Sequence, residues 1–246
     1  MTDQPILHAR ALVRSYGMTP ALRGVTVRVA QGEILAVTGP SGCGKSTLLH
    51  CFAGILRPDA GEVWYRGERV DTRSEKQRSR LRRTEFGVLF QFGQLVAELT
   101  AAENVAMPLL LSGVPRRSAR ADAALWLDRF GVGDLADSRP GEVSGGQQQR
   151  IALARALVTE PRVLFADEPT GALDSLTGEQ VLGQLVRVAR GQETTVVLVT
   201  HDARVAAYGD REIALSDGQV DTSGLGLTAP VGQHGTPLHA RHEATR

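Results

Sequence analysis

The sequence predicts an α/β fold with a mostly parallel sheet, an antiparallel strand layer at the N-terminus and an inserted helical subdomain. Three observations lead to this prediction. Four short apolar runs are continuous, as is typical of strands buried on both faces of a parallel sheet. Segments of alternating apolar and polar residues, punctuated by glycine, precede these runs, and a long interval with helical spacing separates the second run from the third.

Composition and charge exclude several classes of protein. The 246 residues, 42% of them apolar, can form one sizeable core, and the net charge of +1 argues against a protein that binds nucleic acid through a strongly basic body. The apolar runs are far shorter than the roughly 20 residues that cross a bilayer, and no secretory signal is visible. With only Cys43 and Cys51, a disulfide framework is implausible and a reducing cytoplasm is expected.

The strands are predicted in chain order. The antiparallel layer is expected in "ILHARALVRSYG" and "ALRGVTVRVAQG", and the buried parallel strands over 33–39, 86–91, 162–167 and 194–200. Ligands bind outside the carboxyl ends of parallel strands. At those ends the sequence places Gly39, Gln91, Asp167, Glu168 and His201. Each run taken singly could be a core strand followed by an ordinary turn, but the occurrence of such residues after all four runs favours a ligand-binding site.

The helical subdomain is predicted over about 92–160. Leu125, Leu127 and Phe130 suit an apolar stripe on one of its helices, and Gly131 and Gly133 suit the stop of that helix. The tail, 222–246, is rich in glycine, proline and small residues and is predicted to be disordered. A metal site formed by the three histidines of the tail is not the preferred interpretation, because no cysteine or preorganised scaffold accompanies them.

The stretch "GPSGCGKST" matches the phosphate-binding pattern G-x-x-x-x-G-K-[ST], after a predicted strand and before an apolar helix. Its glycines let backbone N–H groups turn toward phosphate oxygens, and the helix start adds unpaired donors. Lys45 is one of only two lysines among 28 basic residues. An ammonium on a flexible stem fits between phosphates where a planar guanidinium would be bulky. Ser46 then offers a hydroxyl ligand to Mg²⁺.

Asp167 and Glu168 close the third predicted parallel strand. An aspartate there can hold Mg²⁺, and a second carboxylate can polarise the water that attacks a γ-phosphate. The alternative is a capped helix start, since Pro169 follows, and the pair alone leaves both interpretations open. A GTPase would carry an N-K-x-D motif, which is absent.

The stretch "SGGQQQRIALARAL", 144–157, places two glycines after a serine at the start of a second helix, which suggests close backbone approach to an anion. With this stretch the sequence resembles the ABC transporter ATPases. The P-loop, "VSGGQ", "VLFADE", "GALD" and "VTHD" occur in the order of that family. The resemblance covers about residues 5–221 and implies a P-loop NTPase that hydrolyses ATP with Mg²⁺. Val143 departs from the leucine usual in the family, a conservative change.

The resemblance also implies a dimer in which each ATP lies between the P-loop of one cassette and the "SGGQ" signature of a second, identical copy. Tyr16 resembles the aromatic residue that stacks on adenine, Gln91 the Q-loop residue, Asp174 the D-loop aspartate and His201 the switch histidine. The implied catalytic residues are Glu168, His201, Gln91 and Lys45; the ATP contacts are Tyr16, Gly39, Pro40, Ser41, Gly42, Cys43, Gly44, Lys45, Ser46, Thr47, Ser144, Gly145, Gly146, Gln147 and Asp174; the Mg²⁺ ligands are Ser46, Gln91 and Asp167.

The segment 90–113 resembles a narrower branch, the MacB/LolD type of lipoprotein-release and macrolide-efflux cassettes. It implies a partner permease with few transmembrane helices and a place on the cytoplasmic face of the membrane. A cassette that regulates a cell-wall hydrolase or a sensor through its membrane partner is the alternative. The same segment could grip a partner helix or be buried in the subdomain. The basic run 66–83, with interleaved acids, predicts a solvated helix, with anionic lipid headgroups as a further possibility.

Overall fold

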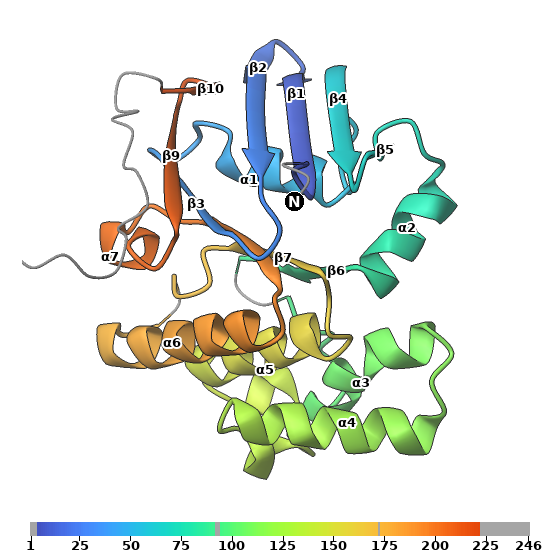
Figure 1. Cartoon of the computed structure of the whole chain (residues 1–246). Coiled ribbons are helices and arrows are strands. Elements are labelled where there is room, and N and C mark those ends of the chain that lie inside the picture. Colours follow the sequence, from blue (N-terminus) through green and yellow to red (C-terminus); the bar gives the residue numbers. More distant parts are fainter. Residues whose placement is uncertain (1–3, 92–93, 172, 222–246) are drawn as a thin grey trace, which may run out of the picture.

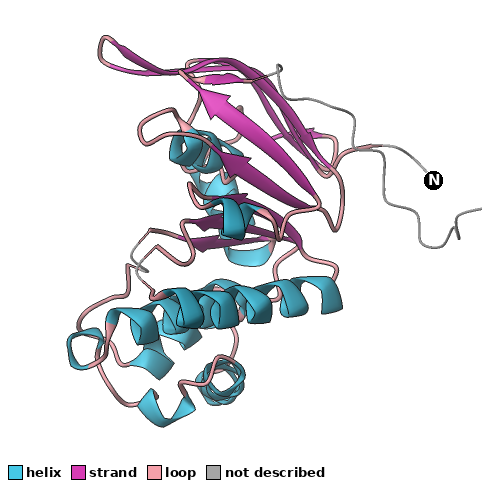
Figure 2. Cartoon of the chain, turned by 90° about the vertical axis from the view of Figure 1, so that its left-hand side faces the viewer, coloured by secondary structure: helices cyan, strands magenta, loops and turns pink. Residues whose placement is uncertain are grey.

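A computed structural model describes residues 4–91, 94–171 and 173–221, in two sheets and a helical subdomain (Figure 1). The central sheet has the strand order β10-β9-β3-β8-β7-β6, and a second sheet has the order β2-β1-β4-β5. Helix α1 (Lys45–Phe52) packs between them, in contact with strands of both. Figure 2 shows these layers edge on, with the helices at 101–111, 116–129, 145–157 and 175–191 on the far side of the central sheet. The predicted fold class is confirmed.

The central sheet contains the four predicted parallel strands, β3 (Ile34–Thr38), β6 (Phe86–Leu89), β7 (Val163–Asp167) and β8 (Thr195–Val199). Almost every residue in them is buried, which explains why their sequences are continuously apolar. Their register aligns the carboxyl ends, with Leu89 opposite Ala166 and Asp167 opposite Val199. The sheet is extended by β9 (Arg211–Ser216), parallel to β3, and by β10 (Gln219–Val220), antiparallel to β9.

The predicted antiparallel layer begins with β1 (Leu7–Tyr16) and β2 (Thr19–Val29), and β4 (Ala60–Tyr65) and β5 (Glu68–Arg69) complete it. Along β2, Val25, Val27 and Val29 are buried while their neighbours are exposed, which is the period of a strand with one face on a core. That face packs on α1 in the same hydrophobic cluster as β3 and β8.

The helical subdomain consists of α3 (Ala101–Leu111), α4 (Arg116–Arg129), α5 (Gly145–Leu157) and two short 3-10 turns, Gly133–Leu135 and Pro140–Glu142. The three helices pack on one another, and α6 (Ser175–Gly191) lies beside α5 under the central sheet (Figure 1). Helix α2 (Glu75–Thr84) precedes β6, and α7 (Ala203–Ala206) follows β8. None of the helices in the described ranges combines the length and the apolar character that a bilayer crossing requires.

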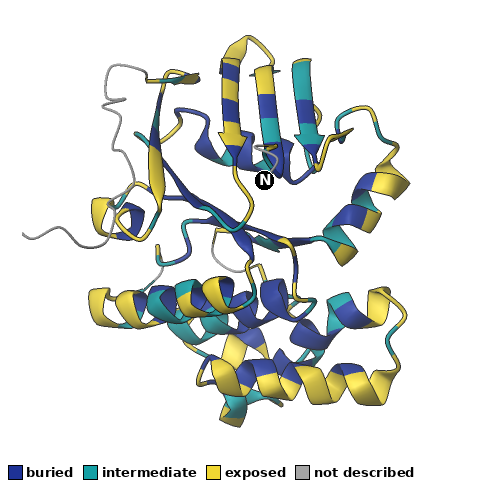
Figure 3. Ribbon diagram, in the orientation of Figure 1, coloured by how far each residue is buried: buried dark blue, intermediate teal, exposed yellow. Residues whose placement is uncertain are grey.

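The predicted stripe on α4 is wrong at one position. Trp126, Leu127 and Phe130 are buried, but Leu125 is 59% exposed. Ala123, Trp126, Leu127 and Phe130 follow the i, i+3, i+4, i+7 spacing of one helix face, and Leu125 lies about 150° around the helix from the centre of that face, near its opposite side. The exposed side of α4 is visible in yellow in Figure 3. Gly131 has a φ of 64° and ends the helix, as predicted.

Candidate functional site

The P-loop joins β3 to α1 with a backbone that only glycine adopts easily. Gly39, Gly42 and Gly44 have φ values of 138°, 79° and 104°. A Cβ on Gly39 would lie 2.1 Å from the carbonyl oxygen of Leu215, and one on Gly44 would lie 2.3 Å from that of Ala21. The loop is therefore pressed against the backbone of its neighbours at both ends. The left-handed glycines curve the loop into a cradle at the start of α1.

Helix α1 begins at Lys45 without a side-chain cap and without an acidic residue in its first turn. The first N–H groups of a helix have no partner within the helix, so they are free to bind an anion. Lys45 is only 7% exposed, and its Nζ donates hydrogen bonds to the carbonyl oxygens of Gly39, at 2.7 Å, and Pro40, at 2.8 Å. The ammonium group thus lies inside the loop and provides the positive charge that a phosphate requires.

Asp167, the last residue of β7, is 4% exposed, and its Oδ1 is buried with no hydrogen-bond partner among the described residues. Burial raises the pKa of this carboxyl group, although a hydrogen bond from the Ser46 side chain and the charges of His50 and Lys45 oppose the shift. A buried, unpaired carboxylate oxygen is costly, and a cation would satisfy it. A carboxylate and a hydroxyl together are the oxygen donors that Mg²⁺ prefers, so these residues fit that ion.

Glu168, the next residue, has a left-handed backbone with a φ of 47°. Its Oε1 lies 2.7 Å from Nδ1 of His201, and its Oε2 accepts a hydrogen bond of 3.3 Å from the Thr200 hydroxyl. A positive φ in a residue other than glycine is strained, and such strain is common in active sites. The helix-cap interpretation of the Asp-Glu pair is wrong, because no helix begins here; α6 starts at Ser175.

Gln91 follows β6 and has an exposed side chain. Because Leu89 pairs with Ala166 in parallel register, the carboxyl ends of β6 and β7 lie side by side, and Gln91 and Glu168 each follow one of these ends. Gly39, Gln91, Asp167, Glu168 and His201 therefore lie along one edge of the central sheet, as the sequence predicts.

A cavity of about 240 Å³ opens at the P-loop. It is lined by Tyr16, Thr19, Pro20, Ala21, Gly42, Gly44, Lys45, Ser46 and Thr47. Tyr16 is 49% exposed, and the Arg14 guanidinium lies 5.3 Å from the centre of its ring. The exposed ring stands at the mouth of this cavity, where an aromatic base can stack on it. Cys43 and Cys51 are buried and unbridged.

The "SGGQ" signature is absent from the lining of this cavity. It opens α5, which lies on the opposite face of the central sheet from α1 (Figure 1). Within the chain, Ser144 caps α5: its Oγ accepts from Gln147 N, and Gln147 Oε1 accepts from Ser144 N. A Cβ on Gly146 would lie 3.1 Å from the Leu173 side chain, so a glycine keeps α5 close to the segment before α6.

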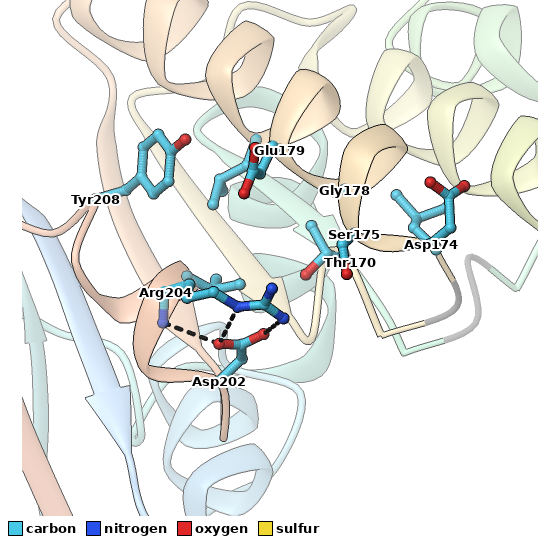
Figure 4. Close-up of a pocket in the computed structure, with 11 residues that line it drawn as sticks. Thr170, Asp174, Ser175, Gly178, Glu179, Asp202, Arg204 and Tyr208 are labelled. Carbon is cyan, nitrogen blue, oxygen red and sulfur yellow. Dashed lines mark hydrogen bonds and ion pairs between the residues drawn. The ribbon is translucent and has the colours of Figure 1, made fainter.

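Asp174 caps α6, with its Oδ1 accepting from Thr177 N at 3.0 Å. A second cavity, of about 80 Å³, lies beside it between the start of α6 and α7, where Arg204 pairs with Asp202 (Figure 4). This space is much smaller than the cavity at the P-loop and contains none of the P-loop residues. Asp174 therefore does not line the cavity at the P-loop within one chain.

Two residues that the sequence analysis did not single out contribute to the site. Thr200 donates to Glu168, and its place before His201 could have drawn attention to it. Gln149, buried on α5, donates from Nε2 to the Pro169 carbonyl oxygen at 2.9 Å, so it ties the signature helix to the segment after Glu168. No sequence pattern identifies that contact, because it joins residues of two distant elements. The histidines of the tail lie outside the residues that the structure describes. Among the described residues, no group of three or more histidine, cysteine, aspartate or glutamate side chains could hold a metal ion.

Known proteins resemble this chain in sequence and in fold. The model of the ABC transporter family matches residues 22–171. The lipoprotein-releasing system ATP-binding protein LolD 2 of Caulobacter vibrioides is 44% identical over 225 residues, which are 90% of this chain and 98% of that protein. The macrolide export ATP-binding/permease protein MacB 1/2 of Paracoccus denitrificans is 43% identical over 223 residues, 89% of this chain and 33% of that longer protein.

Among solved structures, a dimeric post-hydrolysis state of the ATP-binding cassette MJ0796 bound to ADP and Pi has a TM-score of 0.84 and 36% identity. The match covers 87% of this chain and 96% of that one. The cassette fold, the P-loop cradle and these relatives agree. The chain belongs to the ABC transporter family, in the branch of LolD and MacB, and is an ATP-binding, ATP-hydrolysing subunit of a transporter.

Proposed function

We propose that residues 5–221 form a cassette, with a helical subdomain over about 92–160, that dimerises on ATP and drives an export-type permease from the cytoplasmic face of the membrane. The separation of the signature from the P-loop carries the proposal. Because α1 and α5 lie on opposite faces of the central sheet, Ser144, Gly145 and Gly146 of one chain cannot close its own P-loop cavity. A second copy in head-to-tail orientation supplies them. The dimeric MJ0796 cassette supports this arrangement.

In the proposed reaction, the P-loop amides and Lys45 hold the ATP phosphates. Ser46, Asp167 and Gln91 would hold Mg²⁺, which neutralises phosphate charge when bound. Glu168 accepts a proton from the attacking water, and its carboxylate is aimed by the 2.7 Å contact with His201. The other ATP contacts proposed are Tyr16 with the base, the remaining residues of 39–47 with the phosphates, and Gln147 and Asp174 through the partner cassette.

The proposed docking site for the permease is a groove of about 640 Å³ beside Gln91, between the central sheet and the helical subdomain. Ile55, Val88, Phe90, Met107 and Pro108 give it an apolar lining. Such a groove accepts a short amphipathic helix, which would couple the position of Gln91 to the membrane partner. In the segment 90–113, Val105 and Leu109 are buried in the subdomain, while Met107 and Pro108 line the groove and would contact the partner helix.

The LolD and MacB relatives support an export or mechanotransmission type of partner. The test uses tagged Glu168→Gln protein, which keeps the geometry of the side chain but not its basicity. With Mg-ATP we expect this variant to form dimers and to copurify with a permease of few transmembrane helices from native membranes. Glu193→Gln is the control, because Glu193 is exposed and precedes β8, at the end of that strand away from His201. This variant should dimerise and copurify as wild type does. A monomeric Glu168→Gln chain at saturating ATP would contradict the dimer, and a copurifying hydrolase regulator would favour the regulatory alternative.

A further inference from the structure

A basic and apolar patch lies where α2 and α3 end and α4 begins. Leu110 and Leu111, at the end of α3, are 42% and 58% exposed. These are large apolar side chains on the surface, side by side in the sequence, at a helix end rather than scattered singly. The patch consists of Arg80, Arg83, Leu110, Leu111, Arg116 and Arg117.

The three helix ends are joined. Arg83 Nη1 donates a hydrogen bond of 3.1 Å to the Leu111 carbonyl oxygen, and Ser112 Oγ donates one of 3.4 Å to the Arg83 carbonyl oxygen. Helix α4 then begins at Arg116, after a short turn. In Figure 3 the end of α3 and the start of α4 are exposed, whereas the last turn of α2 is partly buried. The cations and the leucines therefore lie on neighbouring helix ends.

The positive charge of the patch is uncompensated. No aspartate or glutamate occurs over 76–84 or over 104–121. Glu75 pairs with Arg78 and Arg82, neither of which belongs to the patch. Among the described residues, no ion pair is found for the arginines of the patch. This differs from the rest of the basic run, where Arg69 and Arg73 each have an acidic partner.

Exposed leucines flanked by arginines without acidic partners fit a surface that is both negatively charged and apolar just below its charges. The headgroup layer of an anionic bilayer has both properties: leucines enter the acyl boundary while long cationic side chains reach the phosphates. An acidic protein segment would match the charge but would leave the leucines without a reason. We propose that this patch binds anionic phospholipids at the membrane surface.

The position of the patch agrees with this assignment. Two of its residues follow the groove in the chain: Arg82 and Pro108 line the groove, and they precede Arg83 and Leu110 by one and two residues. If a permease helix occupies the groove, as proposed above, the patch faces the bilayer beside the permease. Only this orientation rests on the proposed function; lipid binding by the cassette alone does not.

The test is flotation of the full-length chain with vesicles of phosphatidylcholine alone or mixed with phosphatidylglycerol. Wild type should float with the mixed vesicles only and should be released at about 1 M salt, where the Debye length falls to roughly 3 Å. Arg116→Glu with Arg117→Glu should weaken vesicle affinity at least about 25-fold, given the worth of each basic side chain near such a surface. Glutamate in the first turn of α4 suits the helix dipole, so this variant should fold.

Two further variants separate the contributions. Leu110→Gln with Leu111→Gln should lower affinity about tenfold through lost apolar burial. Arg23→Glu with Arg28→Glu makes the same change of charge on exposed positions of β2 and should float as wild type. ATPase activity should be unchanged in all three, so a failure of lipid binding would leave the proposed function intact.

Equal flotation of wild type and Arg116→Glu/Arg117→Glu would overturn the proposal, as would equal binding to neutral vesicles. A third outcome would also overturn it: no flotation of wild type, with the same variant losing capture by membranes that contain the permease. That result would assign the patch to an acidic segment of the protein partner.

Discussion

Lys45 provides the sharpest test of the nucleotide site, because the chain contains a natural control. Its Nζ is buried and donates two hydrogen bonds within the P-loop, at 2.7 and 2.8 Å, whereas Lys76, the only other lysine, is exposed on α2. Hydrogen bonds from a charged donor contribute about 1.5–3 kcal/mol each. An ammonium has three N–H donors, so one more is available to a phosphate oxygen, and Lys45→Ala forfeits about 1.5–3 kcal/mol of ATP binding, roughly 10- to 100-fold in Kd.

Lys45→Arg extends the test from charge to shape. The side chain of Lys45 is only 7% exposed, so a planar guanidinium has no room there, and we expect ATP binding to weaken although the charge is kept. Lys76→Ala and Lys76→Arg should leave the Kd unchanged. The assay is titration with a fluorescent ATP analogue, with circular dichroism to confirm folding. A Kd for folded Lys45→Ala within about threefold of wild type would refute the argument that this ammonium binds phosphate.

Three further predictions concern the carboxylates at the carboxyl end of β7 and two glycines. Glu168→Gln should lower the single-turnover hydrolysis rate by about 10²–10⁴ at unchanged ATP affinity, whereas Glu193→Gln should not; near-normal turnover would remove Glu168 from the role of base. Burial raises the pKa of Asp167 above its unfolded value, so its charge destabilises the nucleotide-free chain increasingly as pH rises through that raised pKa. Asp167→Asn should therefore raise the free energy of unfolding in urea by about 1–3 kcal/mol at neutral pH. This difference from wild type should vanish below the unfolded pKa of the aspartate. A difference that does not change with pH would contradict the reasoning. Gly183→Ala, on α6 with nothing within 4 Å of its added Cβ, should raise the free energy of unfolding by roughly 1 kcal/mol. Gly39→Ala should abolish ATP binding, because its Cβ would lie 2.1 Å from a carbonyl oxygen. A Gly39→Ala variant with the ATP affinity of wild type would argue against the tight loop.

The sequence predicts the strands of the central sheet well because their burial on both faces leaves a continuous apolar run. Strand β9 was not singled out: only two of its six residues are buried, and it lies near the edge of the sheet. The burial of Leu125 was predicted wrongly because it is adjacent in sequence to the buried Trp126 and Leu127, and only its angular position on the helix places it on the exposed side.

The residue types of the site were predictable, but their contacts were not. A motif indicates that Glu168 and His201 belong to one site, yet the 2.7 Å contact depends on the register of β7 and β8. Similarly, the serine and glycines of the signature suggested an anion site, whereas within one chain the Ser144 hydroxyl caps α5. The groove beside Gln91 arises from elements far apart in sequence, so no single segment predicts it.

The central claim, that the signature of one copy closes the P-loop of another, is tested most directly by cross-linking. Both native cysteines are buried, so new ones can be placed at exposed Ser41 in one chain and exposed Gly145 in a second. In the Glu168→Gln background, with Mg-ATP and a short bis-maleimide, we expect a cross-linked heterodimer that depends on ATP and is absent when either variant is alone. Cross-linking of the Ser41→Cys chain to itself, or no ATP-dependent heterodimer, would contradict the head-to-tail site.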